Sequence, residues 1–107
     1  MLPSDMYKVF YHAGDELGIK TRVQKGHAYL DESGLHVRGP ARISIPGTEM
    51  HDITLFRLHG LGRVVRIDHA SGRLFISVVR FMIGQFAAIN FFKTGELYER
   101  LRGSASG

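Results

Sequence analysis

The sequence predicts a mainly β protein, an antiparallel β-barrel or sandwich of about seven strands capped by one C-terminal α-helix. Three observations predict this class. Short segments of alternating apolar and polar residues follow one another from residue 6 to residue 91, and glycine-containing turns separate most of them. Only the last segment has a helical pattern. Hairpins of this spacing form an antiparallel meander, and a single helix would cover one open end of it.

The strand-like segments are bounded by turn residues. Glu32-Ser33-Gly34 is typical of a hairpin in which glycine takes a positive φ. Pro46-Gly47 ends one strand, and His69-Ala-Ser-Gly72 joins two others. In chain order, the segments are 6–12, 19–24, 27–31, 35–38, 41–45, 51–58, 63–68, 73–81 and 85–91.

The final segment predicts a helix over 94–102. Thr94 is an acceptable N-cap, and Gly103 is a typical stop. Glu96 in the first turn and Arg100 in the last suit the helix dipole, and the two form an i,i+4 pair. The apolar stripe that would pack on the barrel consists of Leu97, Leu101 and Tyr98.

The length of 107 residues indicates one domain. We expect an N-terminal strand or extension over 1–18, the barrel and helix over 19–102, and a flexible tail over 103–107. Because there is no cysteine, disulfides, thiolate catalysis and cysteine-bound zinc are excluded. The first residues lack a signal-peptide pattern, and the longest apolar stretch, 81–92, is too short to span a bilayer. We therefore expect a cytoplasmic protein, with peripheral association with the inner membrane as an option.

Positive charge is unevenly distributed, and ten of the fourteen cations are arginine. Residues 1–52 carry six basic against seven acidic residues, and residues 53–107 carry eight against three. In the strands of 19–45 the apolar residues lie on one face and the polar residues on the other, which predicts a solvent-exposed and mildly basic outer face. Arginine suits bidentate contacts with phosphate and carboxylate groups, so this face is a candidate site for an anionic ligand such as a lipid headgroup. Its candidate ligand-binding residues are Lys20, Arg22, Lys25, Arg38 and Arg42.

The strands after residue 53 are apolar on both faces, which is typical of strands buried on both sides. The helix can cover only part of the outer face, so a surplus apolar surface would serve as a contact for a protein partner or a second copy. The candidate interface residues are Phe56, Phe75, Val79 and Phe81.

No catalytic constellation stands out. The six histidines form no metal-ligand spacing, and no Gly-x-Ser-x-Gly elbow is present. His59-Gly-Leu-Gly-Arg63 precedes a predicted strand rather than a helix, unlike a phosphate-binding loop. We therefore expect a non-enzymatic protein without a metal or cofactor.

The predicted order of antiparallel strands followed by one C-terminal helix resembles the pleckstrin-homology (PH)-like superfold, and within it the bacterial PH and GRAM-like group. The likeness covers about residues 19–102. It rests on Gly26-His-Ala-Tyr-Leu-Asp-Glu-Ser-Gly-Leu-His-Val-Arg-Gly39, Ile43-Ser-Ile-Pro46, the Ile53 region, Gly62-Arg-Val-Val-Arg-Ile67 and the final strand and helix over 89–101. The resemblance implies a non-catalytic module that binds lipids, peptides or protein surfaces, and Lys20, Arg22 and Lys25 loosely match the headgroup-binding cations of PH domains.

Two alternatives remain open. Arg38-Gly-Pro-Ala-Arg42 is similar to the Arg-x-x-x-Arg element of PilZ domains, which bind cyclic-di-GMP, but Asp52-Ile-Thr54 is followed by Arg57 where the PilZ pattern has glycine. Basic strands with interleaved aromatics are also typical of single-stranded nucleic-acid binders. Arg73, Phe75, Arg80 and Phe81 have that composition, although burial explains the two aromatics better.

Overall fold

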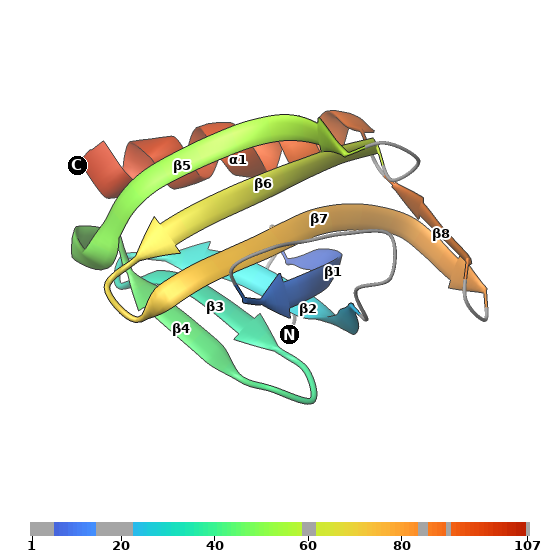
Figure 1. Ribbon diagram of the computed structural model, residues 1–107, viewed down its shortest axis with the longest axis horizontal. Helices are drawn as coiled ribbons and strands as arrows, with labels where there is room; N and C mark the ends of the chain where they lie inside the picture. Colours follow the sequence, from blue (N-terminus) through green and yellow to red (C-terminus); the bar gives the residue numbers. More distant parts are fainter. Residues whose placement is uncertain (1–5, 15–22, 59–61, 84–85, 90, 107) are drawn as a thin grey trace.

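The computed structural model describes residues 6–14, 23–58, 62–83, 86–89 and 91–106 (Figure 1). The side chains at 58, 62, 80–92 and 104–106 lie outside this description. The elements are β1 (Tyr7–Ala13), β2 (Gln24–Asp31), β3 (Gly34–Arg38), β4 (Ile43–Pro46), the 3-10 turn η1 (Gly47–Glu49), β5 (Met50–Leu58), β6 (Gly62–His69), β7 (Gly72–Ile83), β8 (Phe86–Ile89) and α1 (Phe91–Ser106).

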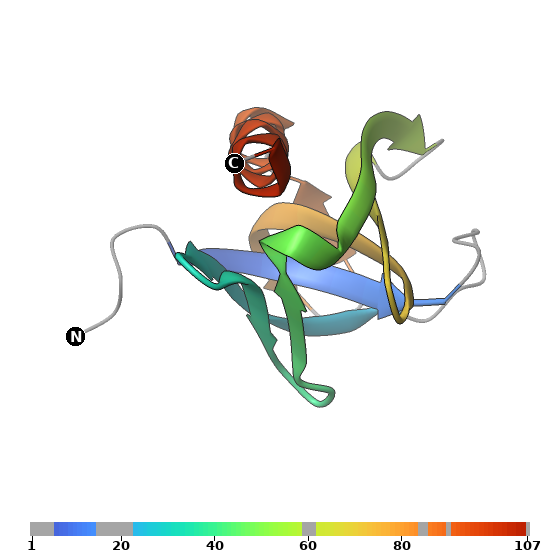
Figure 2. The same cartoon turned by 90° about the vertical axis from the view of Figure 1, so that its left-hand side faces the viewer.

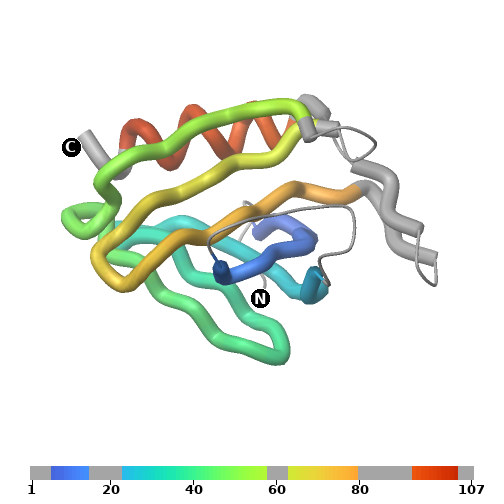
Figure 3. The backbone as a smooth tube through the Cα atoms, viewed as in Figure 1, coloured from blue at the N-terminus to red at the C-terminus, as the bar shows by residue number. Residues whose placement is uncertain are grey.

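All strand pairs are antiparallel, and seven strands follow one another in the order β4-β3-β2-β1-β7-β6-β5, with β8 paired to β7. Two meanders, β1–β4 and β5–β7, are therefore joined where β1 pairs with β7. Val9 lies opposite Val78 in that pairing, and Tyr11 lies opposite Ile76. Figure 3 shows β1 beside β7 although they are far apart in the sequence.

These observations confirm the predicted class: mainly β, antiparallel, with one C-terminal helix. The sheet is bent but not closed, because β4 and β5 are not paired with each other in the described part of the chain. Pro46 offers no backbone N–H to a neighbouring strand. The η1 turn then leads the chain toward the β6–β7 turn, where the Ala70 N–H donates to the Glu49 carbonyl (3.1 Å).

Two hairpin turns need glycine. Gly34, the first residue of β3, has φ +135° and Gly72, the first residue of β7, has φ +142°, a region that side-chain-bearing residues rarely adopt. Gly34 has a second constraint, because a Cβ there would lie 2.1 Å from the Ile45 carbonyl oxygen. The glycine predicted in the turn at 32–34 is thus required both by its positive φ and by the lack of room for a Cβ atom.

The core lies on the concave side of the sheet, where α1 packs against β5, β6 and β7 (Figure 2). Leu97 and Leu101 are fully buried there and Tyr98 packs against them at the margin, which confirms the predicted stripe. Strand alternation supplies the remaining core residues, among them Val9, Tyr11, Ala28, Leu35, Val37, Ile45, Val65, Ile67, Leu74 and Ile76.

The helix differs from its prediction at both ends, since it spans Phe91–Ser106 rather than 94–102. Thr94 is inside it and is not an N-cap. Its buried hydroxyl accepts from the Val78 N–H (3.1 Å) and donates to the Val78 carbonyl (3.3 Å). Gly103 lies within the last turns of the helix and does not end it. A glycine inside a helix costs only about 1 kcal/mol, which the neighbouring residues can offset.

The expected N-terminal extension, 1–18, contains the central strand of the sheet. β1 pairs with β2 on one side and with β7 on the other. It therefore belongs to the same folded unit as the strands that follow it.

Candidate functional site

Three of the five predicted basic residues lie in the described part of the chain. Lys25 on β2, Arg38 at the end of β3 and Arg42 just before β4 are all exposed. Lys20 and Arg22 lie outside the described residues. Arg38 is opposite His27 in the β2–β3 register, and its guanidinium lies 5.6 Å from the centroid of the Tyr29 ring.

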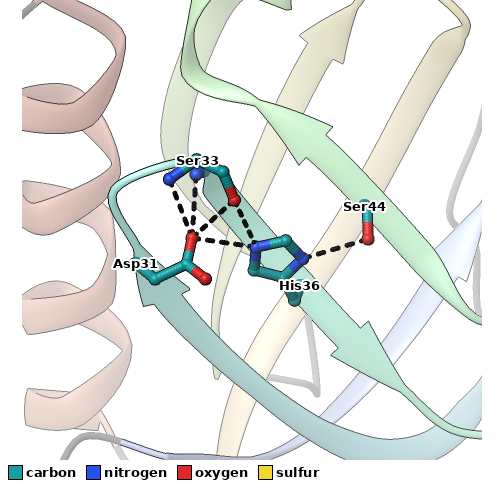
Figure 4. A network of polar contacts seen from close by, with 5 residues as sticks. Asp31, Ser33, His36 and Ser44 are labelled. Carbon is teal, nitrogen blue, oxygen red and sulfur yellow. Dashed lines mark hydrogen bonds and ion pairs between the residues drawn. The ribbon is translucent and has the colours of Figure 1, made fainter.

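A polar network organises the β2–β3 turn (Figure 4). Asp31 Oδ1 accepts from the Ser33 and Gly34 N–H groups (2.9 and 3.2 Å) and from the Ser33 hydroxyl (2.7 Å). The same oxygen lies 2.9 Å from His36 Nε2, and Ser44 Oγ lies 3.0 Å from His36 Nδ1. These hydrogen bonds, that from the Ser33 hydroxyl first, lower the pKa of Asp31 to about 2.

This network contains the residue types of a serine–histidine–aspartate relay but not its arrangement. In such a relay the hydroxyl contacts Nε2 of the histidine and the carboxylate contacts Nδ1. Here the order is reversed for Ser44 and Asp31, because Asp31 contacts Nε2 of His36 and Ser44 contacts Nδ1. Ser33 shares Nε2 with Asp31, at 2.9 Å each. Ser33 lies in the predicted hairpin turn 32–34, and its contacts with Asp31 stabilise that turn.

The predicted apolar interface is mostly covered. Phe75 is 5 % exposed and Val79 is 4 % exposed, and Phe56 is half-buried. The His12 ring stacks on Phe75 (6.4 Å between centroids), and the Phe56 ring meets it edge-on (6.1 Å). The strand pattern therefore overestimated the apolar surface at these positions. The side chain of Phe81 lies outside the described residues, and the interface itself stays a prediction.

The alternatives that rest on arginines stay predictions, and two of their residues, Asp52 and Arg73, form ion pairs in the described part of the chain. Asp52, the PilZ-like acidic position, lies 3.5 Å from Arg66 across the β5–β6 pair. Arg73 binds Asp68 through a 2.5 Å contact, and Arg80 lies outside the described side chains.

A groove that the sequence analysis missed runs between β5 and α1. Its volume is about 700 Å³. Met50 and Ile53 from β5 and Tyr98 from α1 supply the apolar part of its lining. The polar part consists of His51, Asp52, Glu99 and Arg102, with Gly103 at the helix.

The outer edge of β5 is the second feature of this groove. Among the described residues, β5 pairs with β6 on one side and with no strand on the other. Ile53 and Leu55 pack against the core but remain only partly buried. The open sheet therefore offers unpaired backbone groups next to incompletely covered apolar side chains.

No group of three or more histidine or acidic side chains close enough to hold a metal ion occurs among the described residues. Within the same part of the chain, no helix is long and apolar enough to cross a membrane. No protein-family model matches the chain, and no curated protein matches it either.

Proposed function

We propose that this protein is a non-catalytic binding module of the PH-like type, related to the bacterial PH and GRAM-like group, and that its principal role is docking on a protein partner. The strand order, the β1–β7 junction and the single C-terminal helix support this assignment. The observation that carries the docking role is the groove between β5 and α1 beside the unpaired edge of β5.

The proposed ligand is an extended peptide segment that adds a strand to β5. Backbone hydrogen bonds with the outer edge of β5 would supply affinity, and every second side chain of the peptide would point into the groove. Ile53 and Tyr98 are already partly buried there, so a small apolar side chain would complete their burial. Asp52 and Glu99 on one hand and Arg102 on the other would favour a peptide of mixed charge.

The test is a selection of displayed random twelve-residue peptides against the protein, followed by NMR mapping of a selected peptide. We expect shifts along Met50–Arg57 and at Tyr98. Ile53→Ala should weaken peptide binding roughly fivefold, because it removes apolar contact area worth about 1 kcal/mol. Ile43→Ala is the matched control, since Ile43 is also a partly buried isoleucine on an edge strand but does not line the groove.

Peptides that map elsewhere, or equal losses in Ile53→Ala and Ile43→Ala, would contradict the docking role. Raising the salt concentration should change the affinity little, because apolar and backbone contacts dominate this mode. A second copy of the chain is the other partner compatible with the edge of β5, and light scattering at increasing concentration would detect it.

Recruitment to an anionic lipid surface is a second candidate, favoured by the exposure of Lys25, Arg38 and Arg42 on one half of the sheet. Binding to vesicles containing phosphatidylserine should then fall steeply with salt. The double charge reversal Arg38→Glu with Arg42→Glu should abolish it. Vesicle binding that survives this double change would exclude the lipid role for this face.

A further inference from the structure

The loop between β3 and β4 carries an arginine at each end. Arg38 is the last residue of β3, and Arg42 directly precedes β4. The pair of the β3–β4 register nearest the loop is Val37–Ile43, so the two arginines stand at the next position on either side of the hairpin. Val37 and Ile43 face the core, and alternation therefore directs both arginine side chains to the outer face. Opposite positions on one face of a hairpin lie about 5 Å apart, and like charges there repel each other.

Tyr11 holds this loop from across β2. Its hydroxyl donates to the Ala41 carbonyl (2.6 Å) and accepts from the Ala41 N–H (3.3 Å). Tyr11 belongs to β1, which lies in the middle of the sheet, and its side chain is 1 % exposed. Residues 38–42, in contrast, are all exposed. A buried side chain from the centre of the sheet therefore fixes the backbone of an exposed loop.

Two glycines make room for the Tyr11 side chain. Gly26 and Gly39 lie one position beyond the pair of the β2–β3 register nearest the loop, so they face each other. A Cβ at Gly39 would collide with the Tyr11 hydroxyl oxygen, and a Cβ at Gly26 would lie 3.0 Å from Tyr11 Cε1. Pro40 then restricts φ within the loop itself. The local sequence thus favours a single loop conformation that depends on the Tyr11 hydroxyl.

A stack of rings orients the Arg38 guanidinium. It lies 5.6 Å from the centroid of Tyr29, and the Tyr29 ring stacks on His36 with 4.9 Å between centroids. Asp31 and Ser44 hold His36 in turn (Figure 4). A stacked guanidinium uses its face and leaves the N–H groups at its edge for an oxyanion. Because the arginine fork matches the oxygens of a phosphate group, Arg38 is preorganised for phosphate.

The position of the loop favours a membrane surface as the source of that phosphate. The loop projects beyond the strands that it joins (Figures 1 and 2). A projecting loop reaches a planar surface more readily than it encloses a small ligand. Anionic phospholipids present phosphate groups at such a surface, and basic side chains near it are attracted to them.

We propose that Arg38 and Arg42 bind one lipid phosphate as a pair, and that Tyr11 is the positioning residue that holds their loop in the binding conformation. A phosphate between the two guanidinium groups relieves their mutual repulsion. The site rests on the second candidate function, recruitment to an anionic lipid surface, and gives that function a defined geometry in place of a diffuse basic face.

The first measurement is binding of the whole chain to phosphatidylserine vesicles at low salt. Tyr11→Phe keeps the ring but loses both hydrogen bonds to Ala41. It should weaken binding roughly fivefold, because the loop must then be ordered when it binds. Tyr7→Phe is the matched control, since it removes another buried hydroxyl of β1, one that bonds to α1 instead of the loop. It should leave the affinity within twofold.

A double-mutant cycle separates positioning from a general loss of stability. In a protein that already carries Arg38→Gln and Arg42→Gln, adding Tyr11→Phe should change the residual binding less than twofold, since no arginine pair is left to position. Arg42→Lys keeps the charge and loses the fork, and it should weaken binding roughly threefold.

Two further observations address the loop itself. Gly39→Ala forces the loop away from the Tyr11 hydroxyl by a second route and should weaken vesicle binding as Tyr11→Phe does. Hydrogen exchange of the Ala41 amide, measured without vesicles, should be faster in Tyr11→Phe and unchanged in Tyr7→Phe.

The outcomes distinguish this site from the lipid role on which it rests. Vesicle binding that needs both arginines but is equally strong in Tyr11→Phe would overturn the positioning role and leave the lipid role standing. A Tyr11→Phe effect of the same size with and without the arginines, or one matched by Tyr7→Phe, would overturn it too. No vesicle binding by the wild type, or binding that survives the double charge reversal, would overturn the lipid role and this site with it.

Discussion

Replacing Thr94 by valine removes one buried hydroxyl that holds α1 to β7. Thr94 is fully buried, and its hydroxyl contacts both the N–H (3.1 Å) and the carbonyl (3.3 Å) of Val78. The hydroxyl of Ser77, the residue before Val78, donates to the Arg63 carbonyl of β6 (2.6 Å). At Val78 the bonding partner is instead the Thr94 side chain of the helix.

The magnitude follows from these two contacts. Each buried polar group left without a partner costs about 1–3 kcal/mol, so loss of the partner of both Val78 groups should lower the free energy of unfolding of Thr94→Val by about 2–6 kcal/mol. At about 4 °C per kcal/mol for a domain of this size, that corresponds to a decrease in Tm of roughly 8–24 °C. Urea and thermal unfolding followed by circular dichroism would measure both quantities.

Two companion variants make the test specific. Thr94→Ser keeps the hydroxyl and loses only a buried methyl group, which costs about 1 kcal/mol. Thr48→Val changes an exposed threonine in η1 and should alter stability by less than about 0.5 kcal/mol. The reasoning would be refuted if Thr94→Val were as stable as Thr94→Ser, because loss of the hydroxyl would then cost no more than loss of one methyl group.

Two other changes test the hairpins. Gly72→Ala places a side chain at φ +142° with no heavy atom within 4 Å of its Cβ, so backbone strain alone should cost about 1–3 kcal/mol. Gly34→Ala combines a similar φ with a Cβ 2.1 Å from the Ile45 carbonyl oxygen and should cost more; an equal loss of stability in chemical denaturation would contradict the close approach. The pKa of Asp31 is lowered from its ordinary 3.8 to about 2 in the folded protein, so its contribution to stability is present above pH 4 and is lost as pH falls from 4 toward 2. The stability difference between the wild type and Asp31→Asn should therefore narrow over that window, and an Asp31 carboxyl that titrates near pH 4 by NMR would disprove the network.

Alternation and turn chemistry were sufficient to predict most strands and their order along the chain. The β2–β3 hairpin, for example, needs only an alternating pattern and a glycine with positive φ, both of which are local properties. The helix stripe of Leu97 and Leu101 was predictable for the same reason, because its 3.6-residue period depends on the helix alone.

Properties that depend on distant partners were not predictable in this way. Thr94 has the side chain of an N-cap, but its hydroxyl binds Val78. Phe75 lies on the outer phase of its strand, and rings from β1 and β5 cover it. The β5–α1 groove was missed because it forms only where the sheet fails to close, and no residue pattern within β5 signals an unpaired edge.

The central position of β1 has a consequence for the order in which the protein can fold. During synthesis β1 is made before the other strands of the sheet, yet one of its two neighbours is β7, and Tyr7 binds Glu96, which lies 89 positions later. Local hairpins such as β2–β3 form in about 1–10 microseconds. Joining the two halves must wait for closure of a long loop, and folding dominated by such contacts takes on the order of milliseconds to seconds.

The growing chain therefore carries β1 with one edge unpaired until β7 has been synthesised. Val9 and Tyr11 meet their β7 partners only at that stage. Exposed strand edges and apolar side chains are what other nascent chains and chaperones bind. The β1–β7 junction that unites the finished sheet can thus form only late in synthesis, and the interval before it forms is when aggregation competes with folding.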